Sequence, residues 1–145
     1  MIPKAAKNEG VLSPSSGLEM KKVGGRILVV DDEVLILNLI ADVLKSEGYE
    51  VLTAQSAGWA MELFKRHLAE IDLVLADASI SRQNGCELLK EMRTLKPGLR
   101  VVLSSGYVNE PSELDPLELG GTLFIGKPFD IKTLRQVVRR ALSEE

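Results

Sequence analysis

The sequence has little of several features that mark particular classes of protein. A single cysteine, Cys86, excludes an internal disulfide and is typical of a reduced protein. No apolar run approaches the ~20 residues that a membrane-spanning helix needs. The amino terminus has no continuous apolar segment of the signal-peptide type. We therefore expect a cytoplasmic protein without a membrane partner.

Other classes are excluded by charge and by missing motifs. The net charge of −3 gives no general attraction to nucleic acid, so we expect no nucleic-acid partner. The one histidine, His67, lies among charged neighbours, and we interpret it as a solvated residue rather than a ligand. No glycine-rich phosphate loop follows the first apolar segment, which argues against the two commonest nucleotide-binding α/β folds.

The composition that is present suits one folded domain. Residues 1–25 hold prolines, serines and glycines with few large apolar side chains, so we expect a flexible leader or linker. In residues 26–145 a short apolar strand followed by a helix-like stretch repeats five times. This alternation predicts a doubly wound α/β domain with a five-stranded parallel sheet and helices on both faces. Three acceptor side chains are predicted helix N-caps, namely Asp32, Ser56 and Asp130.

The stretch Ile71–Asp77 is the predicted centre of the sheet. Alternation places Ile71, Leu73 and Leu75 on one face and Val74 on the other, so both faces are apolar. A strand that is buried on both faces belongs in the middle of a parallel sheet. It ends in Asp77, at the edge where ligands bind to sheets of this kind.

Further polar side chains follow the other strands and should meet at the same edge. Asp31 and Asp32 end the first strand, Ser105 ends the fourth, and Lys127 follows the fifth. Three carboxylates in one pocket repel each other unless a cation compensates them, and Mg²⁺ suits such a set. A hydroxyl and an ammonium complete a site for a phosphoryl group. The chemistry suggested is attack on phosphorus by Asp77, which stands alone on a central strand, giving an aspartyl phosphate.

Four motifs in chain order then indicate a family. Val-Val-Asp-Asp-Glu, Leu-Val-Leu-Ala-Asp, Leu-Ser-Ser-Gly-Tyr and Gly-Lys-Pro-Phe each lie at an expected strand end. Together they resemble the receiver domains of two-component response regulators, over Arg26 to about Leu142. The resemblance implies a flavodoxin-like sheet of order 2-1-3-4-5, with the site between strands one and three.

The resemblance also assigns roles at the acidic edge. Asp77 would accept a phosphoryl group from the phosphohistidine of a histidine kinase or histidine phosphotransfer domain, in a phosphorelay. Asp32, Asp77 and the backbone carbonyl of Ser79 would bind Mg²⁺ directly, and Asp31 would bind it through water.

Four further residues receive roles by the same resemblance. Ser105 and Phe124 match the family's switch pair, in which the hydroxyl moves toward the phosphate and the ring turns inward. Lys127 and Pro128 would be joined by a cis peptide bond, and Lys127 would balance charge during catalysis.

Two surfaces are expected to bind partners. The first helix is apolar nearly all round, and we expect its surplus residues, Leu35 and Leu37, to dock the helix bundle of a histidine kinase. The resemblance adds a homodimer through the face from helix four to helix five. Residues 109–121, where helix four should lie, are rich in proline and weakly helical, which weakens that expectation.

The main prediction is a phosphoacceptor switch that catalyses only its own phosphorylation and dephosphorylation. One alternative is a degenerate receiver that acts as a protein-binding module. The other is a magnesium phosphatase, although such enzymes carry a second acid two residues after the nucleophile, where this chain has Ser79. The sequence leaves open whether the receiver stands alone or is a piece of a larger protein such as a hybrid histidine kinase.

Overall fold

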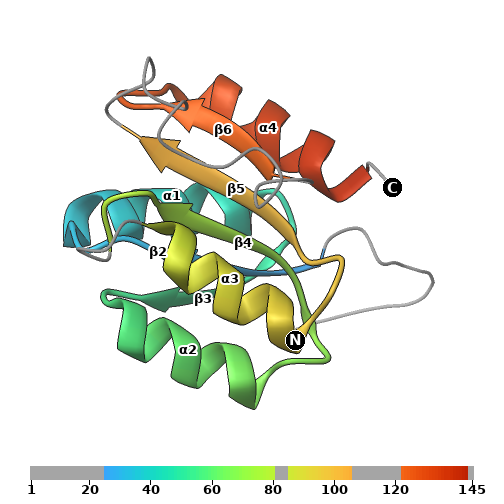
Figure 1. Cartoon of the computed structure of the whole chain (residues 1–145). Coiled ribbons are helices and arrows are strands. Elements are labelled where there is room, and N and C mark those ends of the chain that lie inside the picture. The colour runs from blue at the N-terminus through green and yellow to red at the C-terminus, as the bar shows by residue number, and fades with distance from the viewer. Residues whose placement is uncertain (1–24, 81–84, 106–121, 144–145) are drawn as a thin grey trace, which may run out of the picture.

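A parallel sheet forms the centre of the molecule, as the computed structural model shows (Figure 1). The structure describes residues 25–80, 85–105 and 122–143, and for residues 85–87 and 105 it describes the backbone alone. The strands of this part of the chain are β2 (Arg26–Val30), β3 (Glu50–Ala54), β4 (Ile71–Asp77), β5 (Arg100–Ser105) and β6 (Thr122–Gly126). Their order across the sheet is β3-β2-β4-β5-β6. Because β2 is the first of these five strands along the chain, this is the predicted order 2-1-3-4-5, which is confirmed.

Helices cover both faces of the sheet (Figure 1). On one face lie α1 (Val34–Ser46) and α4 (Ile131–Ser143), and on the other lie α2 (Ala57–Arg66) and α3 (Gly85–Leu95). None of the helices in the described ranges combines the length and the apolarity that crossing a bilayer requires. The expected leader, apart from Gly25, and the expected weak helix at 109–121 lie outside the described residues.

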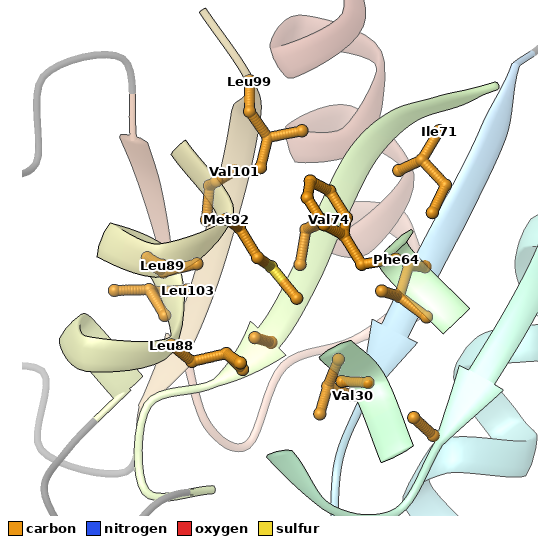
Figure 2. Packing of buried hydrophobic residues seen from close by; sticks show 14 residues of the cluster. Val30, Phe64, Ile71, Val74, Leu88, Leu89, Met92, Leu99, Val101 and Leu103 are labelled. Carbon is orange, nitrogen blue, oxygen red and sulfur yellow. The ribbon is translucent and has the colours of Figure 1, made fainter. Parts of the chain in front are cut away.

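Each face of the sheet has its own apolar core. Figure 2 shows the cluster under α2 and α3, where Phe64, Leu89 and Met92 pack against Val74 and Val101 of the central strands. The second cluster lies under α1 and α4. Its helix residues are Leu37, Ile40, Val43, Leu44, Leu134, Val138 and Ala141. Burial on both faces fixes the strands rigidly, and therefore fixes the side chains at their carboxyl ends.

Two of the three predicted N-caps are confirmed. The Ser56 side chain accepts a hydrogen bond from the Trp59 N–H at 3.1 Å, and Asp130 accepts one from the Thr133 N–H at 2.7 Å. The prediction for Asp32 is wrong, because α1 begins after Glu33, which makes no side-chain capping bond. The nearby carboxylate of Asp31 instead accepts the Glu33 N–H at 2.9 Å.

The predicted faces of β4 need one correction. Ile71 packs with Val74 in the cluster under α2 and α3, not with Leu73 on the other face. A register shift causes this, because Arg26 pairs with Ile71 while the next residue, Ile27, pairs with Leu73. One residue of β4 is skipped, and such an irregularity moves a side chain to the opposite face.

A network of charged side chains around Arg26 holds the amino end of the sheet. The Arg26 guanidinium binds Glu50, with Nε 2.9 Å from Oε1, and it also binds Glu70. The Arg26 N–H donates to Asp72 Oδ2 at 3.0 Å. His67 Nδ1 lies 3.1 Å from Glu70 Oε1, so this histidine belongs to the same network rather than being simply solvated. These pairs tie β2, β3 and the start of β4 together.

Candidate functional site

The carboxyl end of the sheet brings together side chains from three separate strands. Asp31 follows β2, Asp77 ends β4 and Lys127 follows β6. The Asp31 N–H donates to the Ala54 carbonyl at 3.1 Å, which continues the β2–β3 ladder up to this residue. The carboxylates are therefore held by the sheet itself and not by a free loop.

Lys127 joins the two buried acids. Its Nζ donates to Asp31 Oδ2 at 3.1 Å and to Asp77 Oδ2 at 3.0 Å, and it lies 3.9 Å from Glu33 Oε1 at the rim. These contacts connect residues 96 and 50 positions apart in sequence. The predicted meeting of Lys127 with the acids at one edge is thus present in the fold.

The other oxygen of each buried acid accepts from the backbone two residues on. Asp31 Oδ1 accepts from the Glu33 N–H, and Asp77 Oδ1 accepts from the Ser79 N–H at 3.0 Å and from Ser79 Oγ at 3.0 Å. Aspartates commonly form this local turn. Each carboxylate therefore has one oxygen fixed locally and one oxygen held by Lys127.

Burial and charge make this site unusual. Asp31 is 1% exposed and Asp77 is 5% exposed, while Asp32 lies at the surface. Burial lowers the pKa of Lys127, but hydrogen bonds from its ammonium to Asp77 and Asp31 outweigh that effect and raise the pKa above its usual value. Lys127 is therefore charged at neutral pH. It supplies one positive charge against three carboxylates.

The three acids are close enough to share one ion. Asp31, Asp32 and Asp77 each offer a carboxylate oxygen, and these oxygens lie within 4.8 Å of one another. An all-oxygen, negatively charged set of this kind suits a hard divalent cation such as Mg²⁺. The donor set therefore fits the ion that the sequence predicts.

The remaining predicted residues stand as follows. The peptide bond between Lys127 and Pro128 is cis. Phe124 pairs with Leu103 in the sheet and is 44% exposed, so its ring faces outward in this structure. Ser105 ends β5, but its side chain lies outside the described residues, as does the segment 109–121, where the family's fourth helix was expected.

The expectation for the first helix is wrong in one residue. Leu37 is 3% exposed and packs in the core under α1, on the stripe that also carries Ile40. The exposed apolar residues of α1 are Val34 at 45%, Leu35 at 84% and Leu39 at 52%. Apolar residues at i, i+3 and i+7 face the sheet, and Leu37 lies on that stripe.

One polar residue at the site was not predicted. Ser104 lies in β5 directly opposite Asp77 and is 0% exposed. The sequence does contain a signal, since two successive hydroxyl residues end an otherwise apolar strand. The motif drew attention to the second of them, Ser105, and left Ser104 as part of the strand.

The family is shown by comparison with known proteins. Residues 27–139 match the response regulator receiver domain, and the chain belongs to that family. It is a receiver domain of two-component signal transduction, a family whose members interact with histidine kinases or phosphotransfer proteins.

Three relatives show how varied the settings of such domains are. The chain is 32% identical to sporulation initiation phosphotransferase F of Bacillus subtilis, over 81% of this chain and 93% of that protein. It is 35% identical to the alginate biosynthesis transcriptional regulatory protein AlgB of Pseudomonas aeruginosa, of which it spans only 26%. The receiver domain of the hybrid histidine kinase CckA matches with a TM-score of 0.69 and 34% identity, covering 82% of this chain and 100% of that one.

Proposed function

We propose that Asp77 is the phosphoacceptor of this receiver domain, in a phosphorelay that draws on a histidine kinase or a histidine phosphotransfer protein. The observation that carries the proposal is the Lys127 ammonium, which lies 3.0 Å from Asp77 and 3.1 Å from Asp31 inside a cluster of three carboxylates. Asp77 is the member of that cluster that stands on a central strand with an oxygen already oriented by Ser79. The single cysteine supports a cytoplasmic location for this chemistry.

The proposed reaction is a transfer between two side chains. An oxygen of Asp77 forms a bond to phosphorus while the P–N bond to the donor histidine breaks, and the electron pair of that bond returns to the imidazole nitrogen. The Lys127 ammonium stabilises the negative charge on the phosphoryl oxygens as the bond forms. Water later hydrolyses the aspartyl phosphate, which returns the domain to its first state.

We propose Mg²⁺ as the cofactor, held by Asp32 and Asp77 with the Ser79 carbonyl and by Asp31 through water. The close approach of the three carboxylates supports this assignment. When bound, Mg²⁺ neutralises phosphoryl oxygens and lowers the repulsion that the incoming anion meets at the acids. The chain's own part is to hold the acids rigid at the ends of β2 and β4.

The signal would leave the site through Ser105 and Phe124. In our proposal the Ser105 hydroxyl moves toward the phosphoryl group, and the Phe124 ring fills the space that this movement opens. The outward position of that ring, at 44% exposure on β6, supports the proposal because an inward turn would bury apolar surface.

A docking surface for the donor lies beside the site. Val34, Leu35 and Leu39 are exposed on α1, whose first turn follows Asp31 and Asp32 at the acidic edge. We propose that a helix bundle carrying the phosphohistidine packs on this surface. Such a contact would bring the donor imidazole to Asp77.

The surface is tested by charging it. The double variant Leu35→Glu/Leu39→Glu should slow phosphotransfer from a cognate histidine kinase and leave phosphorylation by acetyl phosphate unchanged. Leu95→Glu is the matched control. Leu95 is also an exposed leucine, at 42%, but it lies on α3, which covers the other face of the sheet. Equal slowing with both donors would contradict the docking proposal.

The phosphoacceptor assignment has a direct test. The protein is incubated with Mg²⁺ and acetyl phosphate, and mass spectrometry should show one added phosphoryl group, which Asp77→Asn abolishes. Asp72→Asn is the control, since Asp72 is an exposed acid on the same strand. No uptake by the wild type from acetyl phosphate or from a kinase would favour the protein-binding module instead.

A further inference from the structure

Ser104 is a buried hydroxyl that the proposed reaction does not use. It is 0% exposed, and its Oγ has no hydrogen-bond partner in the described part of the chain. A buried hydroxyl without a partner is unfavourable, and an apolar residue would fill the same place without that cost. The hydroxyl therefore needs an explanation.

The register of the sheet places Ser104 beside the phosphoacceptor. It lies opposite Asp77 of β4 and opposite Ile125 of β6. Paired side chains of neighbouring parallel strands lie on the same face of a sheet. Ile125 packs in the cluster under α1 and α4, so the Ser104 side chain lies on that face, next to Asp77.

The side chain of Lys127 extends across the carboxyl end of β5, where Ser104 lies. It follows β6, yet its Nζ reaches Asp77 at the end of β4 and Asp31 beyond β2. Strand β5 lies between β6 and β4, so the Lys127 side chain passes over the carboxyl end of β5. The Ser104 hydroxyl, which has no partner in the described part of the chain, belongs to that end of β5.

Phosphorylation changes what Lys127 can bind. In the present structure two of its donors go to the carboxylate oxygens of Asp31 and Asp77. A phosphoryl group on Asp77 removes the charge of that carboxylate, so its oxygen becomes a weaker acceptor. The group also occupies space between the two acids. A phosphoryl oxygen then accepts from the ammonium in place of Asp77 Oδ2, and the added bulk displaces the ammonium. An ammonium has three N–H donors, and in the displaced position the donor that Asp31 and the phosphoryl group do not use can bind Ser104.

We propose that Ser104 is a positioning residue for Lys127. Its hydroxyl has no partner among the described residues of the unphosphorylated domain, and it accepts a hydrogen bond from the Lys127 ammonium as the bond from Asp77 to phosphorus forms. This inference rests on the proposed function. It means that the hydroxyl stabilises the phosphorylated state and not the state seen here.

The test compares phosphorylation with stability in the same variants. Ser104→Ala should lower the rate constant for phosphorylation by acetyl phosphate by on the order of tenfold, the effect of losing one hydrogen bond to a charged group. Its unfolding in urea without a phosphodonor should occur at the same or a higher urea concentration than for the wild type. Ser104→Thr, which keeps the hydroxyl, should retain most of the wild-type rate. Ser104→Val, which has the shape of threonine without the hydroxyl, should be as slow as Ser104→Ala.

Thr122→Val is the matched control. Thr122 also has a buried hydroxyl without a partner in the described residues, but it starts β6, opposite Val101 and away from the acids. Its phosphorylation rate should equal that of the wild type. A Ser104→Ala domain that is phosphorylated at the wild-type rate, or that loses rate and stability in parallel, overturns the inference while the function of Asp77 stands. A wild-type domain that takes up no phosphoryl group overturns both.

Discussion

Replacing Lys127 by methionine removes the only positive charge that contacts the two buried acids within the described residues. Asp31 and Asp77 would keep their local hydrogen bonds through Oδ1, but Oδ2 of each would lose its donor. Methionine has nearly the same length and fills the same space, so the packing should change little. The variant therefore isolates the charge.

The size of the effect follows from the separation of the carboxylates. Two unit charges 4.8 Å apart, the upper limit in this cluster, repel by about 3.5 kcal/mol at an effective dielectric constant of about 20 and by about 1 kcal/mol in bulk water. Asp31 is 1% exposed and Asp77 5%, which favours the higher value. Breaking a buried ion pair usually costs about 3–5 kcal/mol. We expect Lys127→Met to lower the free energy of unfolding by about 3 kcal/mol at pH 7.

Urea unfolding measures this loss, first with a chelator and then with Mg²⁺ at matched ionic strength. Lys45→Met, at an exposed lysine of α1, serves as the control and should stay within about 0.5 kcal/mol of the wild type. If Mg²⁺ is held by these acids as proposed, it should reduce the difference between Lys127→Met and wild type, because it would compensate the charges that the variant leaves unpaired. A loss below about 1 kcal/mol without metal would refute the reasoning, since the acids would then behave as if in bulk water.

Two further predictions concern stability. Gly58→Ala should raise the free energy of unfolding by about 0.5–1 kcal/mol, because Gly58 lies in α2 and a Cβ there meets no atom within 4 Å. Gly98→Ala should lower the free energy of unfolding, because Gly98 has a φ of +85°. Urea unfolding that ranks the two variants the other way would contradict this prediction. The stability that Lys127 provides should be lost at alkaline pH. Its pKa is raised in the folded state above the usual 10.5, so the difference between wild type and Lys127→Met should be constant from pH 7 to about 10.5 and shrink above that. A difference that shrinks well below pH 10 in urea titrations would contradict the assignment.

The alternation of short apolar strands with helices predicted the doubly wound parallel sheet, and the resemblance to receiver domains supplied the order of its strands. The sequence predicted the meeting of Asp31, Asp77 and Lys127 because the carboxyl ends of parallel strands share one edge. It did not predict the face of Ile71, which depends on how Arg26 pairs across the sheet. A shift of register is a property of two strands together, and the alternation within one strand does not contain it.

The errors in α1 and β5 have a similar origin. Leu37 was expected at the surface because nearly every residue around it is apolar, so composition alone does not show which stripe meets the sheet. Ser104 escaped notice because a serine inside an apolar strand is usually satisfied by neighbouring groups. Only the packed structure shows that Ser104 lies opposite Asp77 and that its buried hydroxyl has no partner among the residues the structure describes.

The network around Arg26 has a practical consequence for measuring motion in this domain. Its ion pairs with Glu50 and Glu70 lie at the end of the sheet that faces away from Asp77, and they involve none of the groups that phosphorylation would alter. A spin label or isotope-labelled side chain near that end would report the tumbling of the whole body alone. A second label on β6 would report the same tumbling together with any local motion that the phosphoryl group produces. Comparing the two labels would separate the local motion, so the Arg26 end can serve as an internal reference for spectroscopy.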